Sequence, residues 1–275
     1  MMRLIVLALL ACLFLIPEMM ALNPSRTYRQ KPEKYNMEYK EYRVKTNDGE
    51  AALNAWYFPA KVKSTQLILI SHNGEGNMAD YLRRVDQFRQ TTNVLIYDYR
   101  GFGSSSDFRI DPSMAIYPHF IDDLTSMIDF AKQTFSEELS LYGWGIGAGL
   151  SAGVGHHRGE VRRIVADTPF LSMEDLEDRF ASNDIPMTVP NAGFDKSYNP
   201  AYALQTPSGN KALKYLVIIG SKDLLYKPSD MEALFSTVQK RVTSIEVFET
   251  PPGGDHFRAN KAAYMKAINR FLTES

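Results

Sequence analysis

The sequence predicts an α/β protein with a mostly parallel central sheet, an antiparallel hairpin at its N-terminal edge and helices on both faces. Two patterns support this prediction. Short runs that are apolar throughout recur along the chain, and amphipathic stretches of helical length separate them. Such runs suit strands that are buried on both faces of a parallel sheet. Repeated strand–helix units build a sheet of this kind with helices on either side.

The elements follow one another in a regular order. Residues 39–46 alternate polar and apolar side chains, Asn47-Asp48-Gly49 is a turn signal, and Ala52 to Phe58 reads as the return strand of a hairpin. The expected core strands are 66–71, 93–98, 139–142, 161–167, 214–219 and 244–250. The expected helices are 78–90, 118–135, 147–157, 229–238 and 259–273.

One interval breaks this rhythm. Leu171 to Asn210 separates two predicted strands and contains Pro186, Pro190, Pro200 and Pro207. A structureless loop of that length is unusual in a compact domain. We therefore expect a single domain over residues 22–275, with a cap insertion at about 171–210 that covers one end of the sheet.

Composition excludes several classes of protein. With 44% hydrophobic and 23% charged residues, the chain is not wholly disordered. A formal net charge of −1 gives no reason to expect nucleic acid as a partner. The one cysteine, Cys12, can form no internal disulfide and no zinc site built from several thiolates. His156-His157 is expected at a solvated helix end, where adjacent rings make a poor metal pair. We expect neither a metal nor a cofactor.

The first 21 residues are typical of a targeting segment. Arg3 precedes an apolar run of 13 residues, Leu4 to Ile16, which is too short to span a bilayer as a helix. A signal peptide cut after Ala21 fits this pattern and predicts an exported protein, periplasmic or secreted. The alternatives are an uncleaved anchor, a lipid-modified Cys12 in Leu9-Leu10-Ala11-Cys12, or a chain that is not exported. Contact with a membrane is expected only through this segment.

The carboxyl ends of the predicted strands carry the chemical signal, because ligands bind there in open α/β sheets. These ends are Ser71 to Asn77, Asp98 to Ser104, Gly143 to Gly147, Gly220 to Asp223, and Gly253 to His256. In this order they resemble the α/β-hydrolase family, above all its serine aminopeptidase-like and small esterase-like branches. The resemblance covers about Tyr42 to Leu272 and is most specific at Asp98 to Ser104. It implies the α/β-hydrolase fold and hydrolysis of ester or amide bonds.

The family places its nucleophilic serine in a G-x-S-x-G turn between a strand and a helix. The matching segment here is Gly143-Trp144-Gly145-Ile146-Gly147, so glycine stands at the nucleophile position. Glycine adopts the strained backbone of this turn without steric cost but supplies no attacking oxygen. A second match to the pattern surrounds Ser151. We reject it, because Ser151 lies inside the predicted helix rather than directly after a strand.

The resemblance also assigns the remaining site residues. Asp223 matches the acid and His256 the base, which in an intact site orient and activate the serine. The oxyanion hole would use the backbone N–H of Ile146 together with that of Asn73 or Gly74. Asn73 departs from the family pattern, which usually has glycine there.

Three functional readings remain open. The first is a non-catalytic protein that binds a small molecule or a peptide in the former active-site pocket. The second is a hydrolase with residual or altered activity, in which Asp223 and His256 activate water. The third is an active hydrolase in which glycine was introduced. Loss of a triad serine costs about 10⁶ in kcat, and a general base acting on water restores only about 10²–10⁴. This arithmetic favours the first reading. If the rest of the site is intact, Gly145→Ser should gain esterase activity.

Overall fold

The computed structural model describes residues 22–190, 192–208, 212–236, 243–251 and 253–273. The predicted targeting segment, with Arg3, Leu4 to Ile16 and Cys12, lies outside these residues. Within the described ranges, no helix has both the length and the apolar composition needed to cross a membrane.

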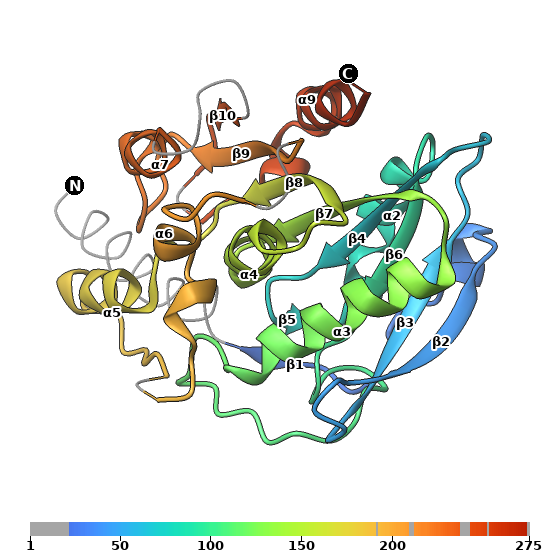
Figure 1. Ribbon diagram of the computed structural model, residues 1–275, viewed down its shortest axis with the longest axis horizontal. Helices are drawn as coiled ribbons and strands as arrows, with labels where there is room; N and C mark the ends of the chain where they lie inside the picture. Colours follow the sequence, from blue (N-terminus) through green and yellow to red (C-terminus); the bar gives the residue numbers. More distant parts are fainter. Residues whose placement is uncertain (1–21, 191, 209–211, 237–242, 252, 274–275) are drawn as a thin grey trace, which may run out of the picture.

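In the described part of the chain, an eight-stranded sheet runs through the centre of the molecule (Figure 1). From one edge to the other, its strands are β10 (Thr243–Phe248), β9 (Lys214–Gly220), β8 (Val161–Asp167), β7 (Glu138–Trp144), β4 (Gln66–Ser71), β6 (Asn93–Tyr97), β3 (Ala52–Phe58) and β2 (Lys40–Lys45). Neighbours from β10 to β6 pair in parallel, whereas β3 is antiparallel to β6 and to β2. The predicted fold class and N-terminal hairpin are confirmed.

The apolar strands are buried on both faces, as their uniform composition requires. In β4, Leu67 and Leu69 belong to one hydrophobic cluster, and Ile68 and Ile70 belong to the other. Successive side chains of a strand point to opposite faces. A strand covered on both sides therefore has apolar side chains at successive positions rather than at alternate ones.

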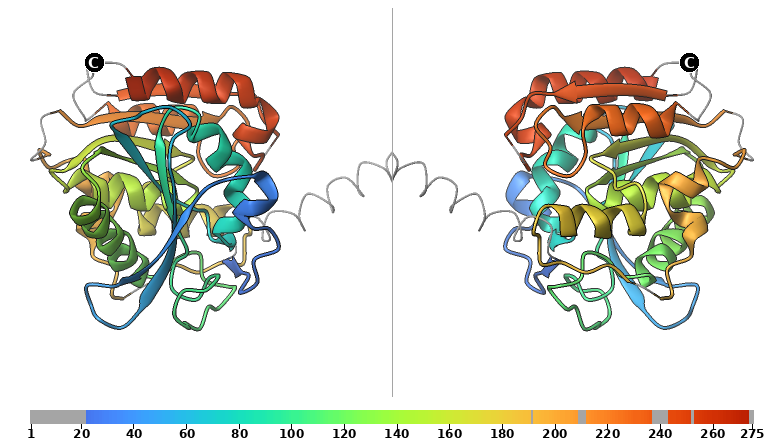
Figure 2. Two further views of the ribbon diagram at one scale, coloured as in Figure 1. Left: turned by 90° about the vertical axis from the view of Figure 1, so that its right-hand side faces the viewer. Right: turned by 90° about the vertical axis from the view of Figure 1, so that its left-hand side faces the viewer.

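Helices cover the two faces of the sheet (Figure 2). The helices whose side chains join the first cluster include α3 (His119–Thr134), α4 (Ile146–His156) and α7 (Pro228–Phe235). Those that join the second cluster include α2 (Leu82–Phe88), the preceding 3₁₀ turn η2 (Met78–Tyr81), and α9 (Lys261–Thr273). Their bounds agree with the amphipathic stretches in the sequence to within a few residues.

The interval between β8 and β9 contains short helices rather than one open loop. They are α5 (Met173–Ser182), η3 (Lys196–Tyr198) and α6 (Pro200–Ala203). Leu176 and Phe180 of α5 are buried in the cluster that also contains α4 side chains. η3 packs on α4 so closely that a Cβ on Gly153 would lie 1.7 Å from the Tyr198 carbonyl oxygen. Whether this segment acts as a separate, movable cap stays a prediction.

The remaining elements are η1 (Pro32–Tyr35), α8 (His256–Ala259) and a two-stranded sheet of β1 (Asn23–Pro24) and β5 (Glu75–Gly76). The β1–β5 pairing brings the N-terminal part of the described chain against the loop that follows β4. The Asn23 N–H donates to the Gly74 carbonyl at 2.9 Å, and Leu22 is fully buried against this loop. The chain directly after the predicted cleavage point is thus bound to the fold.

Candidate functional site

Gly145 is the single residue between β7 and α4. Its backbone has φ 57° and ψ −120°, which a residue with a side chain adopts only under strain. Its N–H donates to the Asp167 carbonyl at 2.9 Å, and its carbonyl accepts from the Ala148 N–H at 3.0 Å. The turn is therefore sharp and held at both ends, and the residue at its apex has no side chain.

The helix after this turn passes very close to the sheet. A Cβ on Gly143 would lie 2.0 Å from the Gly147 carbonyl oxygen, and a Cβ on Gly147 would lie 2.2 Å from the Ser71 carbonyl oxygen. Neither distance leaves room for a carbon atom. The two glycines that flank the turn are thus required by the approach of β7, α4 and β4 to one another.

Ser151 lies inside α4 and is fully buried. Its Oγ has no hydrogen-bond partner among the described residues. A serine within a helix, without a neighbouring base and without access to solvent, is no candidate nucleophile.

Asn73 fills the space in front of Gly145. A Cβ on Gly145 would lie 3.2 Å from the Cβ of Asn73, which is closer than ordinary van der Waals contact. Asn73 Oδ1 accepts hydrogen bonds from the Tyr81 hydroxyl and from the Glu75 N–H, the latter at 3.1 Å. The side chain is therefore fixed where it narrows the room for any side chain at position 145.

Two of the three N–H groups expected in the oxyanion hole already have acceptors. The Asn73 N–H donates to the Tyr81 hydroxyl at 3.2 Å, and the Gly74 N–H donates to His72 Nδ1 at 3.1 Å. Burial lowers the pKa of His72 to about 3, so its ring is neutral and Nδ1 can accept. Ile146 begins α4, where the first N–H groups have no helical partner.

His256 pairs with a carboxylate that the sequence did not single out. Its Nδ1–H donates to Asp167 Oδ1 at 2.7 Å, and the Tyr264 hydroxyl donates to Asp167 Oδ2 at 2.6 Å. Both His256 and Asp167 are buried. Burial opposes the charged imidazolium, but the hydrogen bond and the charge of Asp167 raise the pKa of His256 above its ordinary value. The imidazole is thus held as a donor to Asp167.

Asp223 accepts its described hydrogen bonds from backbone N–H groups of the turn that follows it. Its Oδ1 accepts from the Leu225 N–H at 3.0 Å and from the Tyr226 N–H at 2.8 Å. Burial raises the pKa of Asp223, although the two hydrogen bonds and the nearby charge of His256 act to lower it. The described hydrogen bonds include none between Asp223 and His256. In this structure His256 bonds to Asp167 and the Asp223 carboxylate caps its own turn, and the roles of Asp223 as acid and His256 as base stay a prediction.

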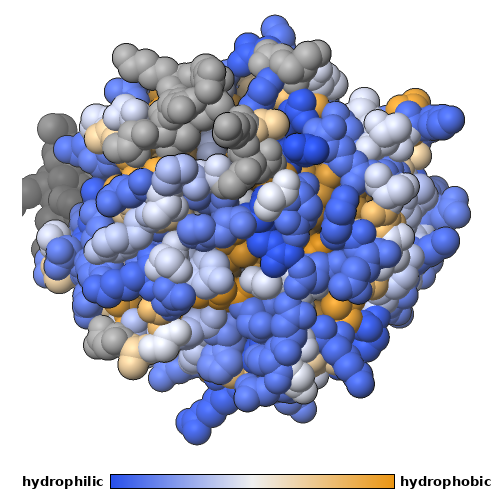
Figure 3. All heavy atoms as spheres, viewed as in Figure 1, coloured by the Kyte–Doolittle hydropathy of each residue, from blue (hydrophilic) through white to orange (hydrophobic). Residues whose placement is uncertain are grey.

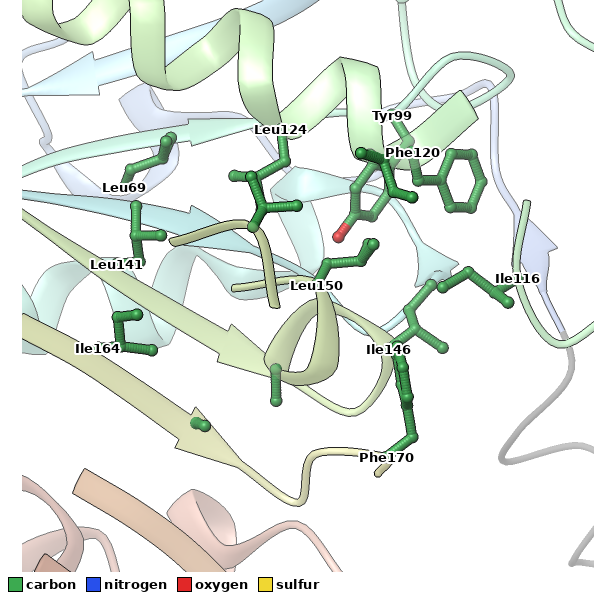
Figure 4. Packing of buried hydrophobic residues seen from close by; sticks show 14 of the residues in the cluster. Leu69, Tyr99, Ile116, Phe120, Leu124, Leu141, Ile146, Leu150, Ile164 and Phe170 are labelled. Atoms are coloured by element: carbon green, nitrogen blue, oxygen red, sulfur yellow. The ribbon is translucent and has the colours of Figure 1, made fainter. Parts of the chain in front are cut away.

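A cavity of about 110 Å³ lies beside Gly145. Its apolar wall includes Ala115, Trp144, Ile146, Phe170, Leu176, Leu225 and Tyr226, and its polar side chains are Asn73, Thr168 and Asp223. Figure 4 shows Ile146, Phe170 and Ile116 together beyond the ends of the strands, whereas Leu69, Leu141 and Ile164 lie along them. His256 is not among the lining residues. The cavity thus contains Asp223 and the Gly145 turn but not the imidazole.

The backbone next to this cavity is strained at Thr168, which has φ 59°. A β-branched residue rarely adopts a positive φ, and such strain concentrates at functional sites. Thr168 directly follows Asp167 and lines the cavity. Its N–H donates to the Ile218 carbonyl at 2.8 Å, which holds the strained turn. At the end of β8, Asp167 thus bonds to His256, and the strained Thr168 that follows it lines the cavity.

Arg84 ties α2 to the loop that carries His256. Its guanidinium forms an ion pair with Asp255 at 2.5 Å and lies 4.5 Å from the Trp144 ring and 4.9 Å from the Phe257 ring. A guanidinium on an aromatic face adds cation–π attraction to the ion pair. Arg84 therefore fixes the residues on either side of His256 and one wall of the cavity.

The residues that sequence reasoning missed are Asp167, Thr168, Tyr81 and Tyr264. Asp167 had a visible signal, because it ends a buried strand of a parallel sheet, where site residues are expected. Tyr264 and Tyr81 lie on separate elements, and nothing in the local sequence announces their contacts with the site.

His156, the last residue of α4, has a structural role instead of the solvated position expected, whereas His157 is exposed as expected. His156 is buried; its Nε2–H donates to the Thr206 carbonyl at 2.8 Å, and its Nδ1 accepts from the Tyr215 hydroxyl at 2.5 Å. A buried imidazole needs such partners, and the cap segment supplies one of them. Across the described ranges, no group of three or more His, Cys, Asp or Glu side chains could hold a metal ion.

Comparison with known proteins identifies the fold of this chain. No protein-family model matches the chain. It is 26% identical over 240 residues to the uncharacterized protein YfhR of Escherichia coli O157:H7, covering 83% of this chain and 76% of that one. Its structure superposes on the esterase Pf2001 of Pyrococcus furiosus with a TM-score of 0.71 and 19% identity, over 92% of this chain and 97% of the esterase.

The α/β hydrolase GrgF from Penicillium sp. sh18 is similar over 86% of this chain and 97% of its own length, with a TM-score of 0.61 and 15% identity. Likeness at this level of identity establishes the fold. The chain has the α/β-hydrolase fold that the strand-end motifs implied.

Proposed function

We propose that this protein is a non-catalytic member of the α/β-hydrolase fold that binds a ligand in the cavity beside Gly145. The observation that carries the proposal is the close approach of Asn73, in the loop after β4, to Gly145 at the apex of the turn. Gly145 supplies no nucleophile, and the Cβ of Asn73 lies 3.2 Å from the position of a Cβ on Gly145. The room for an attacking side chain is thus partly used by another residue.

The position of the base supports the same reading. An imidazole that activates water must reach into the pocket where the substrate lies. His256 is buried on Asp167, and Asp167 in turn accepts from Tyr264. A hydrogen bond from Nδ1 to a carboxylate is also the arrangement that orients a catalytic histidine, so activation of water would require Nε2 of His256 to reach the cavity, which His256 does not line.

The purified wild-type protein is expected to show no labelling by a fluorophosphonate probe and no turnover of short-chain aryl esters. The reason is the missing oxygen at position 145. Labelling is read by intact-protein mass spectrometry, with an active esterase of the same fold as the positive control. A labelled serine in the wild-type chain would contradict the proposal, and its position would identify the true nucleophile.

We further propose that the protein is exported, because Arg3 and the 13-residue apolar run are typical of a signal peptide. The expected mature N-terminus is Leu22, which is buried against the loop after β4. Mass spectrometry of the protein purified from its native host measures this end. An intact Met1 in a cytoplasmic fraction would contradict export, and a lipid on Cys12 would identify an anchored form.

A further inference from the structure

The carboxylate of Asp223 lies in the wall of a mostly apolar cavity, near the charge of His256 but in none of the ion pairs described. Both of its described hydrogen bonds are accepted by Oδ1, from the N–H groups of Leu225 and Tyr226. Oδ2 accepts none of the hydrogen bonds described, and no ion pair described includes Asp223. An ionised carboxylate is costly to bury unless a donor or a cation meets it.

The usual partner of this carboxylate is committed to another group. His256 gives its Nδ1–H to Asp167, which also accepts from Tyr264. Asp223 is thereby released from the role of orienting a histidine. Its remaining oxygen is available to whatever occupies the cavity.

We propose that the cavity beside Gly145 binds a small organic cation, a protonated amine on an apolar body, with its ammonium group on the Asp223 carboxylate. This inference rests on the proposed function and names the class of ligand for the same cavity. An ammonium group brings three N–H donors and a positive charge, which match a carboxylate with a free oxygen. The apolar body would lie against Trp144, Ile146, Phe170 and Leu176.

Other ligand charges fit this cavity poorly. An anion would meet the negative charge of Asp223 in surroundings of low dielectric, where repulsion is strong. A neutral apolar molecule would displace water from the carboxylate and leave it unpaired. Of the three classes, only a cation meets both the apolar wall and the single charged side chain that lines it.

The cationic side chains near the cavity are already neutralised, so they do not supply this partner. Arg84 is paired with Asp255, and Arg179, which lies 4.3 Å from the Tyr226 ring, is paired with Asp175 and Asp230. Lys222, the residue before Asp223, is directed to Glu249 at 3.3 Å. These pairs leave Asp223 as the group available to a ligand cation.

The surroundings also fit a small ligand rather than a broad docking surface. The face seen in Figure 1 is mostly hydrophilic, and its apolar side chains show in hollows between polar ones (Figure 3). The cavity lining includes Leu224, which is 37% exposed. Large apolar side chains with this exposure are few and scattered in the described part of the chain.

The test compares three probes of nearly equal shape: butylammonium, 1-butanol and butyrate. Their affinities for the full-length protein are measured by NMR titration. We expect butylammonium to bind wild type about tenfold or more tightly than 1-butanol, the factor for a hydrogen bond to a charged group, and butyrate to bind least. Asp223→Asn should abolish the preference for the amine. Its Oδ1 can still accept from the Leu225 and Tyr226 N–H groups, so the turn should be kept.

Glu249→Gln is the matched control, because it removes the same charge from an exposed side chain nearby. It should leave the preference unchanged. Equal binding of butylammonium and 1-butanol to wild type would overturn the ligand class but not the binding cavity, and this comparison needs no variant. A preference that survives Asp223→Asn would overturn the role of Asp223. Absence of binding by all three probes, together with fluorophosphonate labelling of wild type, would overturn the proposed function itself.

Discussion

Replacement of Asp123 by asparagine is expected to lower the free energy of unfolding by about 1.5–3 kcal/mol, because it removes the fully buried carboxylate that accepts from Arg100 and leaves the partly exposed Asp48, at 2.9 Å, as the remaining close partner of the guanidinium. Arg100 is only 2% exposed. Its Nε–H donates to Asp123 Oδ1 at 2.8 Å, and its backbone N–H donates to Asp123 Oδ2 at 2.9 Å. Asparagine loses the charge and can serve only one of these donors. Urea unfolding followed by circular dichroism measures the change.

Asp122→Asn is the matched control on the same helix. Its carboxylate is 28% exposed and 3.4 Å from Arg100 Nη2, so we expect a loss below about 1 kcal/mol. If Asp123→Asn unfolds within 1 kcal/mol of wild type, the buried pair does not hold α3 to the end of β6 as the structure indicates. An equal loss in both variants would point to a general effect of helix charge.

This ion pair also shows where sequence reasoning failed. An acidic pair on an amphipathic helix, such as Asp122-Asp123, is by default surface charge, but Asp123 is fully buried. Arg100 lies in the segment Asp98 to Ser104 at the end of a predicted strand, where the resemblance to the family is most specific. The sequence did not indicate that Arg100 turns back onto α3, because that contact joins elements more than twenty residues apart and depends on how the helix lies on the sheet.

The core of the fold was predictable because each strand is a local pattern. Residues 66–71 and 161–167 are strands with the bounds expected from their composition. Short runs that are apolar throughout are typical of strands in the middle of a sheet whose two faces are both covered by helices. The glycines around the turn after β7 were predictable for a similar reason, since close contact of a strand and a helix allows no side chain.

The candidate site was predictable only in part. Strand ends identified Gly145, Asn73, Asp223 and His256 as neighbours, and all except His256 line the cavity. The partner of His256 was not predictable, because Asp167 and Asp223 both follow core strands and differ only in where their carboxylates point. Side-chain direction depends on packing against α9, through Tyr264. Which of these two carboxylates bonds to His256 therefore depends on tertiary contacts, which the local sequence does not show.

Gly145→Ser is expected to destabilise the protein by about 1–3 kcal/mol without producing an efficient esterase. The loss of stability follows from φ 57°, which only glycine tolerates without strain, and from the tight approach to Asn73. Restoration of the serine alone looked sufficient from the sequence. In the structure, His256 is not among the residues that line the cavity beside Gly145, and the Asn73 N–H already donates to Tyr81, so the imidazole and one of the oxyanion donors are not in place for an attack at position 145. Fluorophosphonate labelling and urea unfolding measure the two effects.

A double-mutant cycle with position 73 separates the tight contact from the backbone strain. Asn73→Gly removes the Cβ that would lie 3.2 Å from a Cβ at position 145, whereas Asn73→Ala removes the amide and keeps that Cβ. We expect Gly145→Ser to cost about 1 kcal/mol less in the Asn73→Gly background than in wild type, and the same in Asn73→Ala. Equal costs in all three backgrounds would mean that Asn73 does not restrict the turn. Rapid labelling of the Gly145→Ser protein would mean that Nε2 of His256 reaches position 145 while Nδ1 stays bonded to Asp167, and the non-catalytic reading would then rest on the missing serine alone.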